Sequence, residues 1–101
     1  SLALPLNLRA TRNGTLVTIT WDDPRDEPSA APTDRMMVGI FYADYRNTFT
    51  LEKETGATRR DGKCEISLRD DDGEVCIHPF FARADNTPFS EDKAITLPDT
   101  E

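Results

Sequence analysis

A chain of 101 residues has the length of one domain with a single modest hydrophobic core. Its hydrophobic residues are clustered rather than thinly spread, which indicates a folded domain and excludes a disordered tail. The net charge of −7 repels phosphate backbones and anionic lipids, so we expect neither a nucleic-acid nor a membrane partner. The only tight basic pair, Arg59-Arg60, lies among acids and does not change this expectation.

No apolar run reaches the ~20 residues that a membrane-spanning helix needs. The chain begins with Ser1 rather than Met, so we expect a fragment of a longer protein, and the sequence predicts no compartment. Residues 1–101 are expected to form one domain.

Short apolar runs alternate with polar residues between turn signals along the chain, which is typical of a small all-β domain. No stretch has the period of a long amphipathic helix. The alternation places Val17, Ile19 and Trp21 on one face of a strand that follows a turn at Asn13-Gly14. Seven strands are predicted, at residues 2–11, 15–21, 36–44, 47–53, 64–68, 74–84 and 92–97.

Residues 22–35 are predicted to form an exposed loop. The segment holds three prolines and five acids, a composition that a central strand does not tolerate. Its length of about fourteen residues is long for a connection in a compact domain.

The two ends of the chain resemble a known family. Residues 5–8, the strand ending at Trp21-Asp22 and the following Pro24 are similar to the opening of fibronectin type III domains. Residues 81–86 and the short last strand resemble the close of such domains. The resemblance covers nearly the whole chain and implies a seven-stranded antiparallel β-sandwich, fibronectin type III or immunoglobulin-like, with Trp21 in the core.

One departure leaves the detailed topology open. The family has a tyrosine before the sixth strand, and Val75 or Ile77 occupies that region here. Residues 20–23, 31–35 and 80–86 are also similar to the C-terminal domain of an uncharacterised bacterial family, a likeness that implies no activity or ligand.

Two acidic clusters are candidates for calcium, which takes oxygen ligands. One lies at residues 70–74 and the other at residues 22–27. Neither has the alternating ligand spacing of an EF-hand loop, and we interpret both as solvated turns, with no metal site expected.

Cys76 and His78 share one face of a strand, because residues two apart point the same way. Strand rise alone separates them by ~7 Å, too far for direct proton transfer, and a zinc site needs four ligands. We therefore expect no catalytic, cofactor or metal residue. Strand parity places Cys64 inward and Cys76 outward, and pairing across residues 69–74 would place Cys76 beside residues 66–68, so two free thiols are predicted.

Large apolar side chains remain after one face of each strand is assigned to the core. They form the candidate interface: Met37, Phe41, Tyr45 and Phe80. One interpretation is an outward patch that contacts a partner. The other is that a bulge at Pro79 shifts the register by one residue and places these side chains in the core.

The sequence favours a non-catalytic interaction or spacer module, monomeric in isolation, that docks a protein partner or a neighbouring domain of the parent chain. The alternative is a carbohydrate-binding module, for which Tyr42 and Tyr45 are the available stacking residues, although Tyr42 is predicted to point inward. No nucleophile elbow, paired-carboxylate cleft or histidine-metal motif supports a hydrolase, and we expect no enzyme.

Overall fold

The computed structural model describes residues 6–22, 31–42, 48–69, 73–83 and 94–98. In these ranges the strands are β1 (Leu6–Asn13), β2 (Leu16–Asp22), β3 (Arg35–Tyr42), β4 (Thr48–Glu52), β5 (Lys63–Ser67), β6 (Val75–Ala82) and β7 (Ile95–Leu97). A short 3-10 helix, η1 (Arg59–Asp61), precedes β5. All seven predicted strands are confirmed, with different ends, whereas η1 was not predicted.

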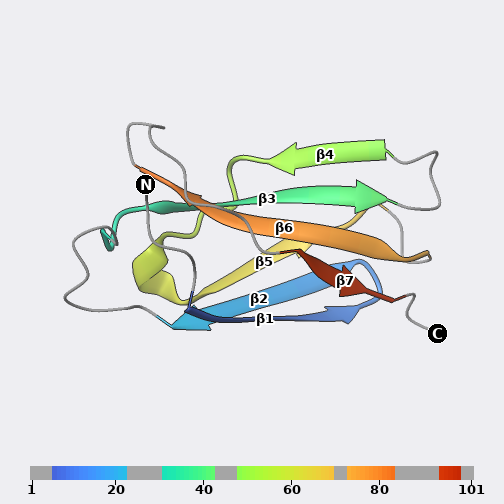
Figure 1. Cartoon of the computed structure of the whole chain (residues 1–101), viewed down its shortest axis with the longest axis horizontal. Helices are drawn as coiled ribbons and strands as arrows, with labels where there is room; N and C mark the ends of the chain where they lie inside the picture. Colours follow the sequence, from blue (N-terminus) through green and yellow to red (C-terminus); the bar gives the residue numbers. More distant parts are fainter. Residues whose placement is uncertain (1–5, 23–30, 43–47, 70–72, 84–93, 99–101) are drawn as a thin grey trace.

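The strands form two antiparallel sheets that face each other (Figure 1). One sheet has the order β1-β2-β5 and the other the order β4-β3-β6-β7. This arrangement confirms the antiparallel β-sandwich. Because β5 and β6 belong to different sheets, the expectation that Cys76 lies beside residues 66–68 is wrong.

The core lies between the sheets and follows the predicted alternation. In β2, Val17, Ile19 and Trp21 are buried, while the residues between them are more exposed. The same alternation holds in β5, whereas β3 is buried along most of its length and β4 contributes no buried side chain. The other buried members of the core cluster are Met36, Val38, Ile40, Tyr42, Ala57, Cys64, Ile66, Leu68, Val75, Ile77, Phe81 and Leu97.

Pro79 does not disturb the pairing of β3 with β6. The register runs without a shift from Arg35 opposite Ala82 to Tyr42 opposite Val75. The alternative in which a bulge at Pro79 shifts the register is therefore wrong, and Phe41 and Phe80 are not turned into the core. The described pairing of β6 with β7 ends at Ile77, so Pro79 lies past it.

Tyr42 is a buried tyrosine at the end of β3, next to the start of β6. It lies directly opposite Val75, and its hydroxyl accepts a hydrogen bond of 3.1 Å from the backbone N–H of Arg69. The Arg69 guanidinium lies 4.7 Å from the centre of the Tyr42 ring. Tyr42 thus ties β3 to the segment after β5, and the departure noted in the sequence leaves the two-sheet arrangement intact.

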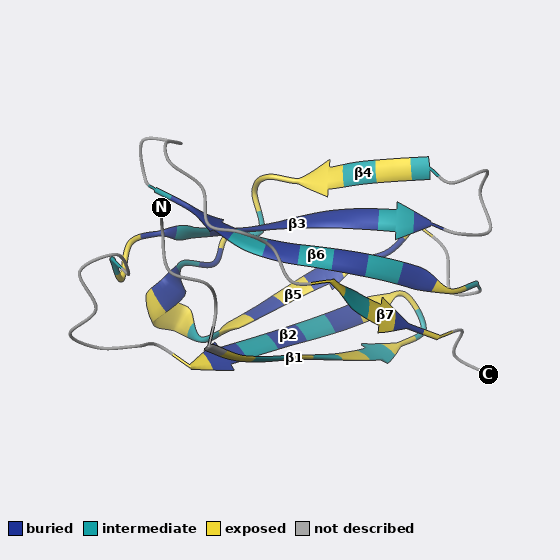
Figure 2. Ribbon diagram, viewed as in Figure 1, coloured by how far each residue is buried: buried dark blue, intermediate teal, exposed yellow. Residues whose placement is uncertain are grey.

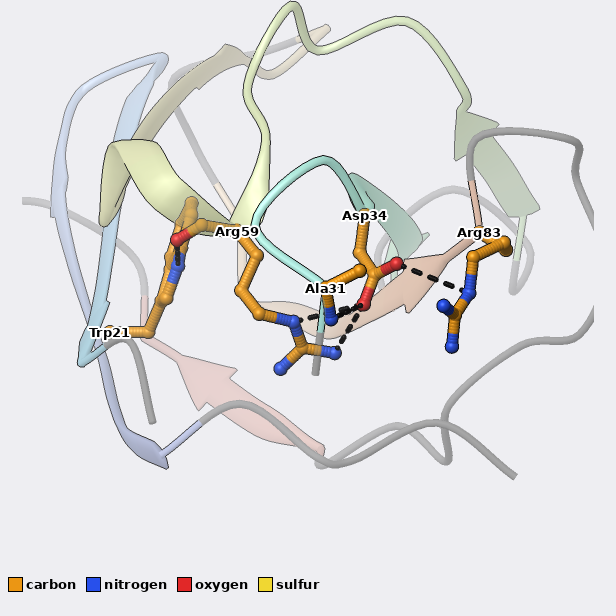
Figure 3. Close-up of polar contacts among 5 residues, drawn as sticks. All are labelled: Trp21, Ala31, Asp34, Arg59 and Arg83. Atoms are coloured by element: carbon orange, nitrogen blue, oxygen red, sulfur yellow. Dashed lines mark hydrogen bonds and ion pairs between the residues drawn. The ribbon is translucent and has the colours of Figure 1, made fainter. Parts of the chain in front are cut away.

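A buried ion pair lies beside η1 (Figure 3). Asp34 and Arg59 are both fully buried, and Nε and Nη2 of Arg59 each lie 3.0 Å from Oδ2 of Asp34. Arg83 approaches the other carboxylate oxygen, with Nε 3.5 Å from Oδ1. The prediction of an exposed loop over residues 22–35 is thus wrong at Asp34, because a buried cation compensates its charge.

The same pair joins the loop to the core. The Asp34 carboxylate accepts a hydrogen bond from the Ala31 N–H, and the Arg59 guanidinium lies 4.0 Å from the centre of the Phe81 ring. The indole N–H of Trp21 donates to the Arg59 carbonyl at 2.8 Å. Trp21 in turn meets Phe81 edge to face, with ring centres 5.6 Å apart. Charge and aromatic packing therefore form one unit at this end of the sandwich.

Candidate functional site

The two outer faces of the sandwich differ in chemistry. The outer face of the β1-β2-β5 sheet is mostly polar, since its outward residues alternate with the core residues of the same strands. Leu16 is its one large exposed hydrophobic residue among those described, at 41% exposure. The other described outward residues are Arg9, Thr11, Asn13, Thr18, Thr20, Lys63, Glu65 and Ser67.

The outer face of the β4-β3-β6 strands is apolar instead. Phe49 and Leu51 on β4 are 58% and 39% exposed, the other two large exposed hydrophobic residues of the described chain. Phe49 lies opposite Phe41, which in turn lies opposite Cys76 on β6. Figure 2 shows β4 as the exposed edge beside the largely buried β3. We call this surface the apolar face, formed by Phe41, Phe49, Leu51, Cys76, His78 and Phe80.

Gly39 shapes the middle of the apolar face. A Cβ atom on Gly39 would lie 2.8 Å from the Phe49 ring and 3.6 Å from the Cβ of His78. The absence of a side chain thus lets the Phe49 ring lie across the strand next to His78. Phe49 is therefore held on the face although more than half of its surface is exposed.

The structure separates the four predicted interface residues. Phe41 and Phe80 point outward and are half-buried. Met37 was also predicted to be exposed, but this prediction is wrong, because its side chain is only 5% exposed. Phe80 lies directly opposite Met37 on the neighbouring strand, so Met37 has a large side chain as its cross-strand neighbour. Tyr45 lies outside the described residues.

Sequence reasoning missed the two most accessible members of this surface. Phe49 and Leu51 lie in the strand predicted at residues 47–53, and neither belongs to the interface predicted from the sequence. The available signal was their period of two on a short segment followed by charged residues, which is typical of an edge strand with one free face. What it did not show is that this side is continuous with Phe41.

Cys76 and His78 meet on the apolar face. The Sγ atom of Cys76 lies 3.6 Å from Nε2 of His78, and both residues are half-buried. The expectation that ~7 Å separates these side chains is wrong, because strand rise fixes the spacing of the Cα atoms and not that of the side-chain tips. A thiol and an imidazole therefore form a direct pair, in which either group can donate.

The two cysteines are free, as predicted, and occupy different environments. Cys64 is buried in the core, and desolvation by burial raises the pKa of its thiol, an effect that a hydrogen bond with the Thr55 side chain opposes. Cys76 lies on β6 in the other sheet, and its side chain is on the outer face of that sheet, away from the core.

We expect one fast and one slow thiol in the native protein. With excess iodoacetamide at neutral pH, Cys76 becomes alkylated first, while Cys64 reacts only after denaturation, because a buried neutral thiol is neither accessible nor nucleophilic. Peptide mass spectrometry assigns the site, and Cys76→Ser should abolish the fast phase. Fast labelling of Cys64 would show that β5 points the other way.

The remaining candidate sites gain no support. No group of three metal-ligating side chains is found among the described residues. Of the acidic cluster at residues 22–27, only Asp22 lies within the described residues. Of the cluster at residues 70–74, only Gly73 and Glu74 do. A hollow of about 310 Å³ lies between β3 and the segment before η1, and its described lining holds no histidine or cysteine. No helix in the described ranges is long and apolar enough to cross a membrane.

Comparison with known proteins decides the fold. No family model and no curated protein matches the chain. It is similar to a solved structure described as "Myokine structure", with 20% identity and a TM-score of 0.59 over 97% of this chain and 99% of that one. It is also similar to the third fibronectin III domain of human KIAA0343 protein, with 13% identity and a TM-score of 0.60 over 99% and 85% of the two chains.

The chain has a fibronectin type III fold. Sequence identities this low show the fold alone. Fibronectin type III domains commonly serve as non-catalytic modules, but a fold does not fix a function, which has to be argued from the surface. On this fold, the apolar face is the described surface that differs most from a polar, solvent-facing sheet.

Proposed function

We propose that this fibronectin type III domain is a non-catalytic protein-binding module whose contact surface is the apolar face. The observation that carries the proposal is the contrast between its two outer sheet faces. One is polar apart from Leu16, whereas the other places Phe49, Leu51 and Phe41 side by side. Contiguous exposed apolar surface of this kind marks interaction sites on soluble proteins.

The form of the surface favours a protein partner. Aromatic side chains in a packed environment dominate binding energy at protein interfaces, and Phe49 is held in place over Gly39. The net charge of −7 favours a partner with a basic rim, since like charges slow the encounter. A neighbouring domain of a longer parent chain meets the same requirements.

The test compares a double variant of the apolar face with a single variant of the polar face, and Leu51→Ser alone is the variant matched in exposure to the polar-face control. Phe49→Ser with Leu51→Ser alters the apolar face, and Leu16→Ser alters the polar face at a leucine of nearly equal exposure, 41% against 39%. The wild type and each variant are immobilised on a resin, in buffer that contains EDTA, and are used to capture proteins from a lysate of the organism that makes this protein. Captured proteins are then purified and titrated back against each variant.

We expect a purified partner to bind the wild type and Leu16→Ser equally and to lose at least tenfold in affinity for the double variant. Urea unfolding checks that all three are folded. Equal binding by the double variant, or loss confined to Leu16→Ser, contradicts the proposal.

Carbohydrate binding receives less support. Trp21 and Tyr42 are both buried, so neither is available to stack on a sugar, and Tyr45 lies outside the described residues. A glycan screen at millimolar ligand runs beside the capture experiment. Binding there that Leu51→Ser leaves intact would favour a carbohydrate module over a protein-binding one.

A further inference from the structure

The Cys76–His78 pair has the geometry of a chelating pair of metal ligands. In a tetrahedral zinc site, Zn–S is about 2.3 Å and Zn–N about 2.0–2.1 Å, which places sulfur and nitrogen about 3.6 Å apart. The Sγ to Nε2 distance in this domain is 3.6 Å. One ion can therefore bind both atoms with almost no movement of either side chain.

The pair is accessible to an ion. Both residues are partly exposed on β6 in the apolar face. Cys76 lies between Phe41 of β3 and Thr96 of the edge strand β7, and His78 lies opposite Gly39. Thiolate and imidazole are the ligands that zinc prefers, and an apolar surrounding strengthens their interaction with the ion. The site is distinct from the acidic clusters, whose oxygen ligands suit calcium.

We propose that Cys76 and His78 form half of a zinc site that a second copy of this domain completes. Zinc in a closed site takes four ligands, and the described residues offer no third ligand beside this pair. A two-fold axis through the ion supplies an identical Cys76 and His78, because a two-fold interface pairs the same patch with itself.

The sheet geometry agrees with this arrangement. Two sheets pack face to face about 10 Å apart, which leaves room for one ion between side chains that reach toward each other from both sheets. The apolar face then meets its own copy, so Phe49 and Leu51 flank the ion from both sides. The inference rests on the proposed function to the extent that both use this face as an accessible contact surface.

The charge balance makes the dimer dependent on the ion. Two metal-free copies, each with a net charge of −7, repel one another. Binding of one Zn²⁺ to two thiols and two neutral imidazoles releases two protons, and the resulting Cys₂His₂ centre is neutral. The apo domain is therefore a monomer, and zinc supplies the bonds that overcome the repulsion.

Cobalt tests the proposal because Co²⁺ in a tetrahedral thiolate site absorbs visible and near-ultraviolet light, whereas Zn²⁺ does not. Reduced apo protein is titrated with Co²⁺ while absorbance is recorded, and its mass is measured by sedimentation with and without EDTA. We expect thiolate absorbance that saturates at one ion per two chains, a doubling of the mass, and displacement of Co²⁺ by Zn²⁺.

Variants assign the ligands. Cys76→Ser abolishes the thiolate absorbance, and His78→Gln weakens binding at least about 100-fold, while Cys64→Ala leaves both signals unchanged. Trp21 fluorescence verifies that each variant is folded. Absence of thiolate absorbance, saturation at one ion per monomeric chain, or dependence on Cys64 would overturn the proposal. None of these outcomes touches the protein-binding test, which is run in EDTA.

Discussion

Asp34→Asn is expected to lower the free energy of unfolding by about 3 kcal/mol, because it leaves the buried Arg59 guanidinium without its counter-charge. Asparagine retains an oxygen that can accept the Ala31 N–H, so the loss reports on charge rather than on the turn. For a domain of this size, whose total stability is roughly 5–15 kcal/mol, this loss is a large fraction. Urea unfolding followed by Trp21 fluorescence measures it.

The matched control is the adjacent arginine. Arg60 is exposed, and Arg60→Ala is expected to change stability by no more than about 0.5 kcal/mol. Arg59→Met removes the other partner, and the double variant Asp34→Asn, Arg59→Met should be more stable than the sum of the single effects predicts, by at least about 1 kcal/mol. Additive single effects would show that the two charges do not interact.

Phe81→Ala is expected to cost about 3–5 kcal/mol, the range measured for removal of a buried aromatic ring. Phe81 is fully buried in β6, meets the edge of Trp21 and carries the Arg59 guanidinium on its face. Its loss therefore leaves a cavity and removes two ring interactions together. The urea midpoint by circular dichroism is the appropriate measurement, since Trp21 emission changes with its neighbour.

A phenylalanine of the same sheet provides the comparison. Phe49 is more than half exposed, and Phe49→Ala is expected to cost less than about 1 kcal/mol. Phe81→Leu should fall between the two, because leucine fills part of the cavity. A loss at Phe49 equal to that at Phe81 would mean that Phe49 belongs to the core and not to a contact surface.

These predictions separate the parts of the domain that hold the fold from the part available for binding. Asp34, Arg59 and Phe81 act at one end of the sandwich and are buried. Phe49 and Leu51 lie on the edge strand and contribute little to the core. Substitutions on the apolar face are therefore suitable for binding experiments, because they leave the fold in place.

Alternation along the chain was sufficient to predict the strands and the direction of most side chains. Val17, Ile19 and Trp21 are buried as expected, and Cys64 points inward while Cys76 points outward. The period of two succeeds because strand geometry is local, and a residue's face follows from its neighbours in sequence. The resemblance to fibronectin type III domains predicted that the strands form a β-sandwich, and the observed strand order confirms this prediction.

Local pattern failed wherever a contact joins distant residues. Asp34 looks like part of an acidic loop, and its burial is explained by ion pairs with Arg59, 25 positions away, and with Arg83. Met37 alternates as an outward residue but is buried, and Phe49 becomes part of a surface through Phe41 and Gly39 on the next strand. The exposure of a side chain depends on which neighbouring strands and side chains cover it, and the alternation along one strand does not show this.

From the sequence we predicted an acidic all-β chain with seven strands, the alternating sides of those strands and two free thiols. The tertiary structure alone decided that β5 and β6 lie in different sheets, that Asp34 and Arg59 pair in the core, and that the tips of Cys76 and His78 meet at 3.6 Å. The physical reason is that strand periodicity fixes direction, whereas sheet pairing and side-chain torsions fix distance, and both candidate sites depend on distance.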